Sequence, residues 1–535
     1  SVSSETYKAL NKNDRFRMAT MVDMTTATGR ETRAQAQGWV LPLSVLIVGS
    51  FMSVLDTSIV NVAVPRIQID LSAAPDDVEW IVTGYTLALG IVVPLTGWLG
   101  MRIGQTRLYI LSMVGFSAAS ALCGIAGNLD EMIFFRVVQA IPGGILPVVT
   151  MTMLYQIVPR EKIGAAMGMY GLGVVVAPAV GPTLGGYLVE YVDWRLIFFI
   201  NVPIGILGTI AALIVFPRIS PTSWPKFDLW GFLTIGYGLF AFLLACSEGQ
   251  DWGWTGYRIM GLFVSGTLSL ALFVVIELEV DNPIIDLRIF KVPAYSVSLI
   301  LLGVVVTGLF ATLYFIPQFL QNVQGLQAFD SGLVLVPSAL VLVVLTPLAG
   351  RIYDKIGPRI PVAIGLVLMA YGSYLLASLR PDTPRPDIEM WTSIRNAGIG
   401  LSMMSIMTAG VSALPGSLTA AGSGMNNVMQ RAASSVAVAV LGSLNTSQGA
   451  QLMLDRSSLL NTGANALPGV NDAAAQGASG LLSLYQELSN AVTTQTYAND
   501  FYVIALLSAA GGALALFLRS GKPKNIGGPV HVVEL

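Results

Sequence analysis

The chain has 535 residues, of which 54% are hydrophobic and only 11% are charged. A soluble protein carries roughly 25% charged residues, and a water-soluble fold of this size could not cover its surface with so few. These figures exclude a soluble multi-domain protein and indicate an all-α polytopic membrane protein. The net charge is −2 and the single histidine is His531, so we expect no nucleic-acid partner, no histidine-based catalysis and no metal site.

Apolar stretches long enough to cross a bilayer recur along the chain, since a spanning helix needs about 20 predominantly apolar residues. They predict fourteen transmembrane helices, at 39–66, 78–100, 107–127, 131–157, 163–189, 195–216, 228–246, 257–277, 293–320, 329–350, 359–379, 388–413, 418–444 and 499–518. Residues 1–36 are polar and contain no apolar signal core, so no cleaved signal peptide is expected.

Lysine and arginine are unevenly distributed among the connecting segments, and cytoplasmic loops carry the excess in membrane proteins. With the N-terminus inside, 20 of the 29 basic residues fall in cytoplasmic segments, 6 fall outside and 3 lie within spans. This predicts an even number of spans and two cytoplasmic termini. Residues 445–498 then form a long polar external loop, interpreted as a tolerated insertion, with a candidate amphipathic helix at 480–492.

Two segments repeat at an offset of 253 residues. GWLGMRIGQTR starts at Gly97 and GRIYDKIGPR starts at Gly350. Each joins one predicted span to the next, and such repeats form two homologous bundles around a midplane site. Six spans need only roughly 200 residues, so the larger offset predicts an additional two-helix hairpin between Phe227 and Glu279.

Several motifs, in chain order, resemble those of a known family. They are LDTSIVNVAVPRI (Leu55–Ile67), the two repeated loops, RVVQ (Arg136–Gln139), GVVVAPAVGPTLGG (Gly173–Gly186), WRLIFFINVPIG (Trp194–Gly205), FDLWG (Phe227–Gly231) and NPIIDLRIF (Asn282–Phe290). Over about 39–520 the chain is similar to the 14-span drug:proton antiporters of the EmrB/QacA type, within the major facilitator superfamily. Met101 and Ala140 depart from the superfamily's usual acidic residue and glycine at these positions.

The resemblance implies the major facilitator fold, with two six-helix bundles and two extra central helices. The predicted divisions are a cytoplasmic tail (1–36), an N-terminal bundle (37–217), the two-helix insertion (218–290), a C-terminal bundle (291–520) that includes the external loop 445–498, and a second cytoplasmic tail (521–535).

Asp56 is the only carboxylate predicted at the centre of a span. A carboxylate inside a membrane is expensive and is by default a functional hypothesis. Arg136 lies at a comparable depth, since the helical rise places Asp56 ~15 Å and Arg136 ~8 Å from the outer ends of their spans. In the family fold both helices line the N-terminal side of the cavity. A carboxylate balanced between burial and an arginine can load and release a proton, and the alternative is a permanent salt bridge that fixes helix packing.

Two glycine- and charge-rich segments are candidates for conformational change. The antiporter-motif candidates, expected to pack closely and bend at the interface between the bundles, are Gly173, Pro178, Gly181, Pro182, Gly185 and Gly186. The gating candidates are Arg102, Gly104, Arg107, Asp354, Lys355 and Arg359. Of these, Asp354, Lys355 and Arg359 are expected to pair with one another or cap helix ends. For the antiporter-motif residues the alternative is ordinary helix packing, and for the gating residues it is the positive-inside bias.

Substrate contacts are specified only by aromatic, amide and methionine side chains inside spans. The candidates are Tyr85, Phe310, Tyr314, Gln318, Met404, Asn426 and Gln430. Such groups accommodate varied apolar or cationic ligands, and lipid contact or core packing is the alternative. The two remaining arginines within spans, Arg395 and Arg431, are expected to bind backbone carbonyls.

Together these features predict a proton-coupled multidrug efflux antiporter that exports amphipathic or cationic compounds by alternating access. The alternative is a dedicated lipid, metabolite or siderophore exporter of the same fold, because one fold carries many ligands. An enzyme would need paired carboxylates or a nucleophile with its base inside the spans, and these are missing. We expect protons as the coupling ion, no other cofactor, a monomer in the cytoplasmic (inner) membrane of the cell, and small amphipathic substrates and the lipid bilayer as partners. An external adaptor protein, as EmrB-type relatives use in two-membrane cells, is a further candidate partner.

Overall fold

The computed structural model describes residues 38–216, 226–458 and 478–518, and in these ranges the regular structure is helical. The predicted tails 1–36 and 521–535 lie outside the described residues. Each of the fourteen predicted spans coincides with helix, which confirms the all-α architecture.

The N-terminal half begins with one long helix and ends with a broken one. Its helices are α3 (Val40–Asp70), α4 (Pro75–Val78), α5 (Trp80–Val92), α6 (Leu95–Ile103), α7 (Gln105–Gly124), α8 (Leu129–Ile157), α9 (Ile163–Tyr191), α10 (Leu196–Phe199) and α11 (Asn201–Val215). The second predicted span bends by 58° between α5 and α6. Pro94 caps α6 at this point, and a proline there removes a backbone donor from the helical ladder.

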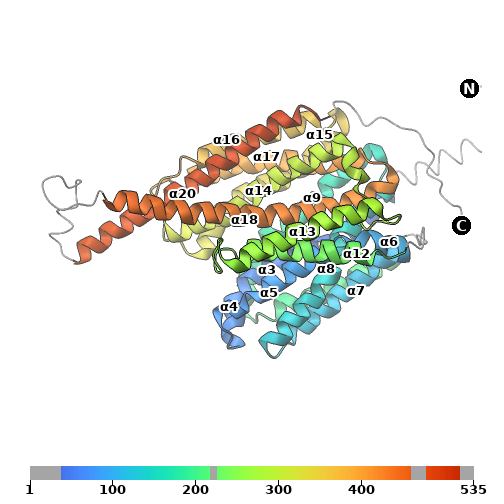
Figure 1. The fold of residues 1–535 in the computed structure, drawn as a ribbon, viewed down its shortest axis with the longest axis horizontal. Helices are drawn as coiled ribbons and strands as arrows, with labels where there is room; N and C mark the ends of the chain where they lie inside the picture. The colour runs from blue at the N-terminus through green and yellow to red at the C-terminus, as the bar shows by residue number, and fades with distance from the viewer. Residues whose placement is uncertain (1–37, 217–225, 459–477, 519–535) are drawn as a thin grey trace, which may run out of the picture.

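The remaining helices form the predicted hairpin and the C-terminal half. They are α12 (Leu229–Glu248), α13 (Tyr257–Glu279), α14 (Pro293–Asn322), α15 (Ala328–Ile356), α16 (Arg359–Leu376), α17 (Arg385–Ser412), α18 (Thr419–Ser458) and α20 (Ala478–Ala515). In Figure 1 the helices α3 to α8 of the first half lie below, most yellow to red helices lie above together with α9 of the first half, and the green hairpin lies between them. The hairpin packs on α5 of one half and α18 of the other.

Among the described residues, eleven helices are long and apolar enough to cross a membrane, and the bent pair α5 and α6 makes a twelfth. The helices at the two remaining predicted spans, α17 and α18, have 28 and 40 residues and so have the required length. They carry more polar residues than the other spans.

The predicted external loop 445–498 is wrong over most of its length. Helix α18 continues to Ser458, and α20 already begins at Ala478. Figure 1 shows both helices projecting at the left beyond the ends of the others. These stretches are polar but contain no proline and many good helix formers, so helix propensity carries the spans onward. The helix expected at 480–492 is present as part of α20 rather than as a separate surface element.

Among the described residues, the two halves share a buried hydrophobic cluster at one end of the molecule. The largest buried cluster joins first-half residues from the predicted cytoplasmic ends of α3, α8 and α9 to the second half; the first-half members include Leu43, Met151, Leu154, Ile163 and Met167. The cluster at the opposite end, around Ile59, Val78 and Trp194, is built from the first half alone. The predicted cytoplasmic end is therefore the closed one.

Candidate functional site

Asp56 and Arg136 form a buried ion pair inside the first half. The Arg136 Nη1 atom lies 2.6 Å from Asp56 Oδ2, and the two side chains are 1% and 0% exposed. Asp56 lies midway along α3, on the face that also buries Ser53 and Val60. The predicted partners therefore meet directly.

Two amides complete the coordination of the carboxylate. Gln139 Nε2 donates to Asp56 Oδ1 at 2.9 Å, and Asn201 Nδ2 donates to the same oxygen at 3.1 Å. Gln139 also accepts from Arg136 Nη1 at 2.7 Å, which its i+3 position on the same helix face allows. Asn201 additionally donates to Ser120 Oγ at 3.0 Å. Side chains of three residues, Arg136, Gln139 and Asn201, thus donate to one carboxylate.

Aromatic rings enclose the arginine. The Arg136 guanidinium carbon lies 3.9 Å from the centroid of the Tyr85 ring and 5.7 Å from that of Phe198. Its Nε donates to the Ile81 carbonyl at 3.3 Å. Cation–π contacts of this kind strengthen when water is excluded. Tyr85, predicted as a substrate contact, is completely buried and forms a wall of the charged site.

Sequence reasoning missed Gln139 and Asn201 as functional residues, although both lie in motifs that it identified. Neither residue carries a charge, so neither stands out in an apolar span. Asn201 starts α11, which is separated from α10 by one residue, and its side chain is buried. Five helices, α3, α5, α7, α8 and α11, hold one ionisable carboxylate in a site without exposed surface.

A second contact joins the two halves at the predicted cytoplasmic end. Asp354 Oδ1 accepts from the backbone N–H of Gly164 at 2.8 Å, and Oδ2 accepts from that of Ala165 at 2.9 Å. A carboxylate at a helix N-terminus satisfies unpaired donors and complements the helix dipole. Asp354 therefore caps α9 across the interface, as one of the two predicted gating roles requires.

Comparison with known proteins identifies the family to which the chain belongs. The model of the Major Facilitator Superfamily matches residues 46–438. The chain belongs to the major facilitator superfamily. The proton:xylose symporter XylE shares the fold, with a TM-score of 0.58 at 14% identity over 92% of this chain and 98% of that chain.

Relatives within the superfamily agree with the predicted EmrB/QacA-type branch. The chain is 35% identical to the uncharacterized MFS-type transporter YhcA of Bacillus subtilis, over 79% of each chain. It is 32% identical to the multidrug export protein EmrB of Escherichia coli, over 75% of this chain and 79% of EmrB. It is 28% identical to the tetracenomycin C resistance and export protein of Streptomyces glaucescens, over 90% and 92%.

The repeated loops of this superfamily member have matching backbones. Gly104 has φ +88° and Gly357 has φ +82°, and each ends a helix. Only glycine adopts such values readily. Arg102 stacks on Trp98 at 5.2 Å. Among the described residues Lys355 and Arg359 form no ion pair, so of the two predicted roles pairing is absent in this conformation and capping, by Asp354, is present.

The antiporter-motif glycines do not face the interface between the bundles, which corrects the prediction. A Cβ atom on Gly173 would meet Ile47, and on Gly181 or Gly185 it would meet Ser58 or Ile59, all on α3 of the same half. Ser58 also donates to the Pro178 carbonyl at 3.4 Å. Gly186 has open space around it. The side chain of Pro182 lies outside the described set.

A different glycine row of α9 makes the contact between the halves. Gly164 abuts Gly350, Gly168 abuts Pro347 and Gly171 abuts Thr346 and Met404. These glycines let α9 approach α15 backbone to backbone, as small residues do in membrane helices. The row precedes the recognised motif and repeats at intervals of three and four residues, which is the signal that sequence reasoning could have used.

The predicted substrate residues do not converge on one pocket. Gln318 accepts from Tyr497 at 3.2 Å, Asn426 accepts from Tyr295 at 3.3 Å, and Gln430 donates to its own helix. Met404 is buried against α9. Phe310 and Tyr314 are each 38% exposed on α14. Packing within the second half accounts for most of this set, as the alternative interpretation allowed.

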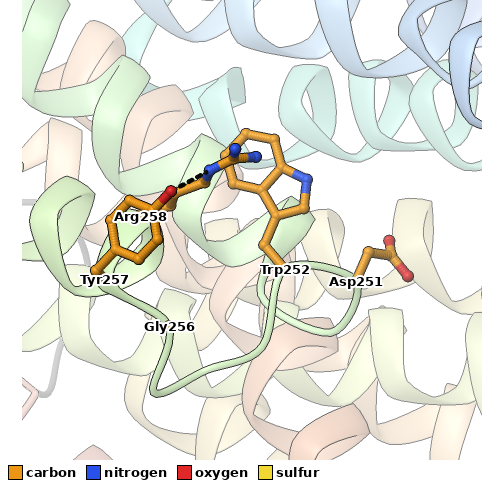
Figure 2. A pocket seen from close by; sticks show the side chains of 5 residues that line it. All are labelled: Asp251, Trp252, Gly256, Tyr257 and Arg258. Atoms are coloured by element: carbon orange, nitrogen blue, oxygen red, sulfur yellow. Dashed lines mark hydrogen bonds between the residues drawn. The ribbon is translucent and has the colours of Figure 1, made fainter.

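A hollow of about 360 Å³ lies on the loop between α12 and α13 and is lined by Asp251, Trp252, Gly256, Tyr257 and Arg258. Figure 2 shows the Arg258 side chain between the two aromatic rings, with its Nε donating to the Tyr257 hydroxyl at 3.3 Å. These side chains are exposed and none of the predicted site residues lines the hollow. It is a feature of the loop rather than a transport site.

In two other family-like motifs, Phe227–Gly231 and Asn282–Phe290, backbone N–H groups donate to nearby carboxylates. Asp228 caps α12 by accepting from Gly231 N at 2.9 Å. Glu277 accepts from the backbone N–H of Ile284 at 3.1 Å, which holds the segment that leads into the second half. Asp286 accepts from Arg288, and this guanidinium lowers the pKa of the Asp286 carboxyl. These carboxylates order the start of α12 and the segment that follows α13, and they lie outside the candidate site.

Asn201→Ala is expected to lower the thermal stability of the purified protein by about 1–3 kcal/mol, because two buried acceptors lose a donor. The acceptors are Asp56 Oδ1 and Ser120 Oγ. Thermal unfolding in detergent measures the change. Asn427→Ala is the control, since that amide is partly exposed and donates only to its own helix. Equal stability of the two variants would contradict a structural role for Asn201 in the site.

Asp354→Ala is expected to weaken closure of the predicted cytoplasmic end by about 0.5–2 kcal/mol, the usual value of a helix cap. A cysteine introduced at the buried Thr346 should then react with a maleimide about 2- to 30-fold faster. The native Cys123 and Cys246 are buried and give a low background. Lys355→Ala should leave the rate unchanged, because this side chain is exposed and forms no ion pair with any residue that the structure describes. An unchanged rate in Asp354→Ala would mean that the cap does not hold the two halves together.

Proposed function

We propose that this superfamily member is a proton-coupled efflux antiporter that exports amphipathic compounds by alternating access. The observation that carries the proposal is the Asp56–Arg136 pair, with the carboxylate fully buried and held by two amides. The names of relatives that export drugs support the direction of transport.

The proposed cycle uses one carboxylate as the proton carrier. When the site opens outward, Asp56 takes up a proton, and the neutral acid no longer balances Arg136. The resulting change in charge favours rearrangement of α3 and α8, which carry the pair. After the site opens inward, the proton leaves and the ion pair forms again. Each proton supplies about 2.3 kcal/mol per 100 mV of membrane potential and about 1.4 kcal/mol per pH unit.

The two halves supply the alternating element. The cytoplasmic end is closed by the Asp354 cap and by the glycine row of α9. The superfamily's rigid-body rocking would break both contacts as the site opens to the cytoplasm. The proposal includes two cytoplasmic termini, a monomer as the working unit, protons in place of any cofactor, and no enzymatic activity. An external adaptor is not required by this cycle.

Reconstitution in proteoliposomes tests the proposal. Wild-type protein should move a fluorescent amphipathic compound against its gradient only while a pH gradient is imposed. Collapse of the gradient with a protonophore should stop transport. A panel that also contains lipid and siderophore probes separates the multidrug exporter from the dedicated one: transport of a single class would replace the multidrug proposal. Transport that ignores the pH gradient for every compound would refute proton coupling.

A further inference from the structure

Two buried carboxylates lie at the predicted cytoplasmic base of the α12–α13 hairpin, and the proposed transport cycle does not use them. Asp228 precedes α12 and is 8% exposed, and Glu277 lies in the last turn of α13 and is 5% exposed. One begins the hairpin and the other ends it, so the folded hairpin brings them together. Carboxylates are rarely buried to this degree without a partner.

Each carboxylate binds backbone N–H groups through one oxygen and leaves the other oxygen without a partner. Asp228 Oδ1 accepts from Gly231 N at 2.9 Å. Glu277 Oε1 accepts from Ile284 N at 3.1 Å and from Ile285 N at 3.4 Å. Asp228 Oδ2 and Glu277 Oε2 are buried and have no hydrogen-bond partner within the described residues. Buried polar atoms normally find partners, and each exception calls for an explanation.

The two carboxylates meet beside Gly231. A Cβ atom on this glycine would overlap Asp228 Oδ2 and would lie 3.1 Å from Glu277 Oε1. Both side chains therefore approach one point, and the glycine that ends the Phe227–Gly231 motif leaves that point open. The missing side chain is what allows the two carboxyl groups to lie next to each other.

The described part of the chain supplies no ion pair for either carboxylate. Asp286, on the segment after α13, is bound to Arg288, and Arg102 on the neighbouring α6 stacks on Trp98. The other charged side chains on the segments that carry or border the pair are exposed, namely Lys226, Glu279, Asp281 and Lys291.

Two like charges at one buried point are costly, and proteins avoid this cost when the two groups share a proton and titrate as a pair. A bound metal ion is the other way to neutralise two carboxylates. Within the described residues, however, no group of three or more acidic, histidine or cysteine side chains could hold a metal ion. The arrangement of Asp228 and Glu277 is therefore better suited to a proton.

The pair holds a segment that closes the predicted cytoplasmic end. Ile284 and Ile285, whose N–H groups bind Glu277, belong to the buried cluster that joins the two halves. Phe227, next to Asp228, packs on Trp98 in the first repeated loop, with ring centroids 4.8 Å apart. A change of charge at the pair therefore acts directly on segments of the closed end.

We propose that Asp228 and Glu277 share one proton taken from the cytoplasm, and that this proton site regulates opening of the cytoplasmic end. With the proton bound, the carboxyl groups stay together, Glu277 holds Ile284 and Ile285, and the end remains closed. As the cytoplasmic pH rises, the proton leaves, the two negative charges repel each other, and the segment is released. The site is separate from Asp56, which lies midway along α3.

This regulation rests on the proposed antiport function, in which every cycle of export brings protons into the cell. Protons that accumulate in the cytoplasm bind to the pair and slow further opening of the cytoplasmic end. The exporter thereby limits the acidification that its own activity causes.

Infrared titration of the full-length protein detects the proton directly, from the band of a protonated carboxyl group. At about pH 7, where an exposed carboxyl is ionised, the wild-type protein should show a band that is lost in Asp228→Asn and equally in Glu277→Gln. The double variant should lose no more than either single variant, because one proton is shared. Glu279→Gln is the matched control, since this carboxylate lies on the same helix turn but is exposed, and it should keep the band.

Substrate exchange measures the regulatory effect. The Asp56→Asn background is used because exchange needs no gradient and its pH dependence cannot come from Asp56. Counterflow should be about 2- to 30-fold slower at about pH 6 than at about pH 8, the factor that corresponds to one capping carboxylate. Addition of Glu277→Gln, which keeps an uncharged acceptor for Ile284, should hold the rate at the acidic level throughout. Addition of Glu279→Gln should leave the pH dependence unchanged.

A band that survives in Asp228→Asn would mean that Glu277 is protonated alone, and a band lost on addition of Na⁺ or Ca²⁺ at constant pH would mean that the pair binds a cation. Either result would overturn the shared proton. Exchange that keeps its full pH dependence after addition of Glu277→Gln would refute the regulatory role.

The proposed function fails in a different way. If no compound is transported while the carboxyl band behaves as expected, the antiport proposal and the regulation that rests on it are wrong, and the proton site remains. If transport follows the pH gradient but the wild-type protein shows no such band, antiport stands and the proton site is refuted.

Discussion

Asp56→Asn is expected to abolish uphill export driven by a pH gradient while leaving downhill exchange of substrate across the membrane. A gradient of two pH units supplies about 2.7 kcal/mol per proton, or roughly a 100-fold accumulation at one proton per substrate. Without a titratable group that ratio should fall to about one. The measurement is substrate accumulation in proteoliposomes under the imposed gradient, compared with counterflow without it.

A purely structural ion pair would produce a different pattern. Asparagine presents an amide nitrogen or a weaker acceptor to Arg136, and removal of one member of a buried pair costs about 3–5 kcal/mol. Loss of transport in the single variant could then reflect misfolding. The double variant Asp56→Asn with Arg136→Gln removes both charges and relieves that penalty. If the pair only fixes packing, the double variant should regain gradient-driven export.

Our proposal predicts that the double variant folds, exchanges substrate and remains uncoupled. Asp330→Asn serves as the control, because that carboxylate is exposed near the start of α15 and should retain full coupling. Gradient-driven accumulation at the wild-type level in Asp56→Asn would refute the assignment of the proton to this residue.

The Asp56–Arg136 contact could be predicted because charges are rare in this chain. A single central carboxylate and three arginines within spans leave few pairings, and helical rise and the family fold reduce them further. The supporting amides could not be found this way. Gln139 and Asn201 are uncharged, and their roles depend on how α8 and α11 are rotated toward α3.

At the outer ends of α18 and α20 the sequence predicts a loop, but the structure has helix. Their composition is that of a polar loop, and a hydropathy argument ends the spans at 444 and 499. The chain remains helical because its polar residues face a second helix. Asn499 donates to Gln448 at 2.8 Å and Asn445 donates to Asp500 at 3.3 Å. The predicted span begins at residue 499, which puts Asp500 at its edge. The sequence therefore does not predict that Asp500 is buried, as it is in α20.

The glycines of α9 show a third limit of prediction from the sequence. Sequence can indicate that a helix is packed closely, but it does not identify the helix that approaches. The recognised motif, from Gly173 onward, packs on α3 within the first half, whereas the unrecognised row from Gly164 to Gly171 meets the second half. Only the second group can take part in opening and closing.

Gly168→Leu is therefore expected to prevent closure of the predicted cytoplasmic end and to abolish cyclic transport. A Cβ atom at Gly168 would lie 2.7 Å from Pro347 Cα and 3.1 Å from the Thr346 carbonyl oxygen. Both are backbone atoms, which cannot rotate away as a side chain could, so the two helices must separate. Overpacking typically costs about 1–3 kcal/mol, and this cost applies only to the closed conformation because each half can fold without the contact. The closed population should fall by roughly 5- to 150-fold, since each 1.4 kcal/mol is tenfold.

The Thr346→Cys probe measures that population, because the residue is 2% exposed at this contact. Its maleimide reactivity should rise in Gly168→Leu by the same factor, while binding of substrate from the cytoplasmic side persists. Gly186→Leu is the matched control on the same helix, since a Cβ atom there meets nothing within 4 Å. Wild-type reactivity and transport in Gly168→Leu would show that the two halves separate elsewhere. A loss of folding in both glycine variants would instead place the sensitivity in α9 itself, and the interface between α9 and α15 would then not be the element that alternates.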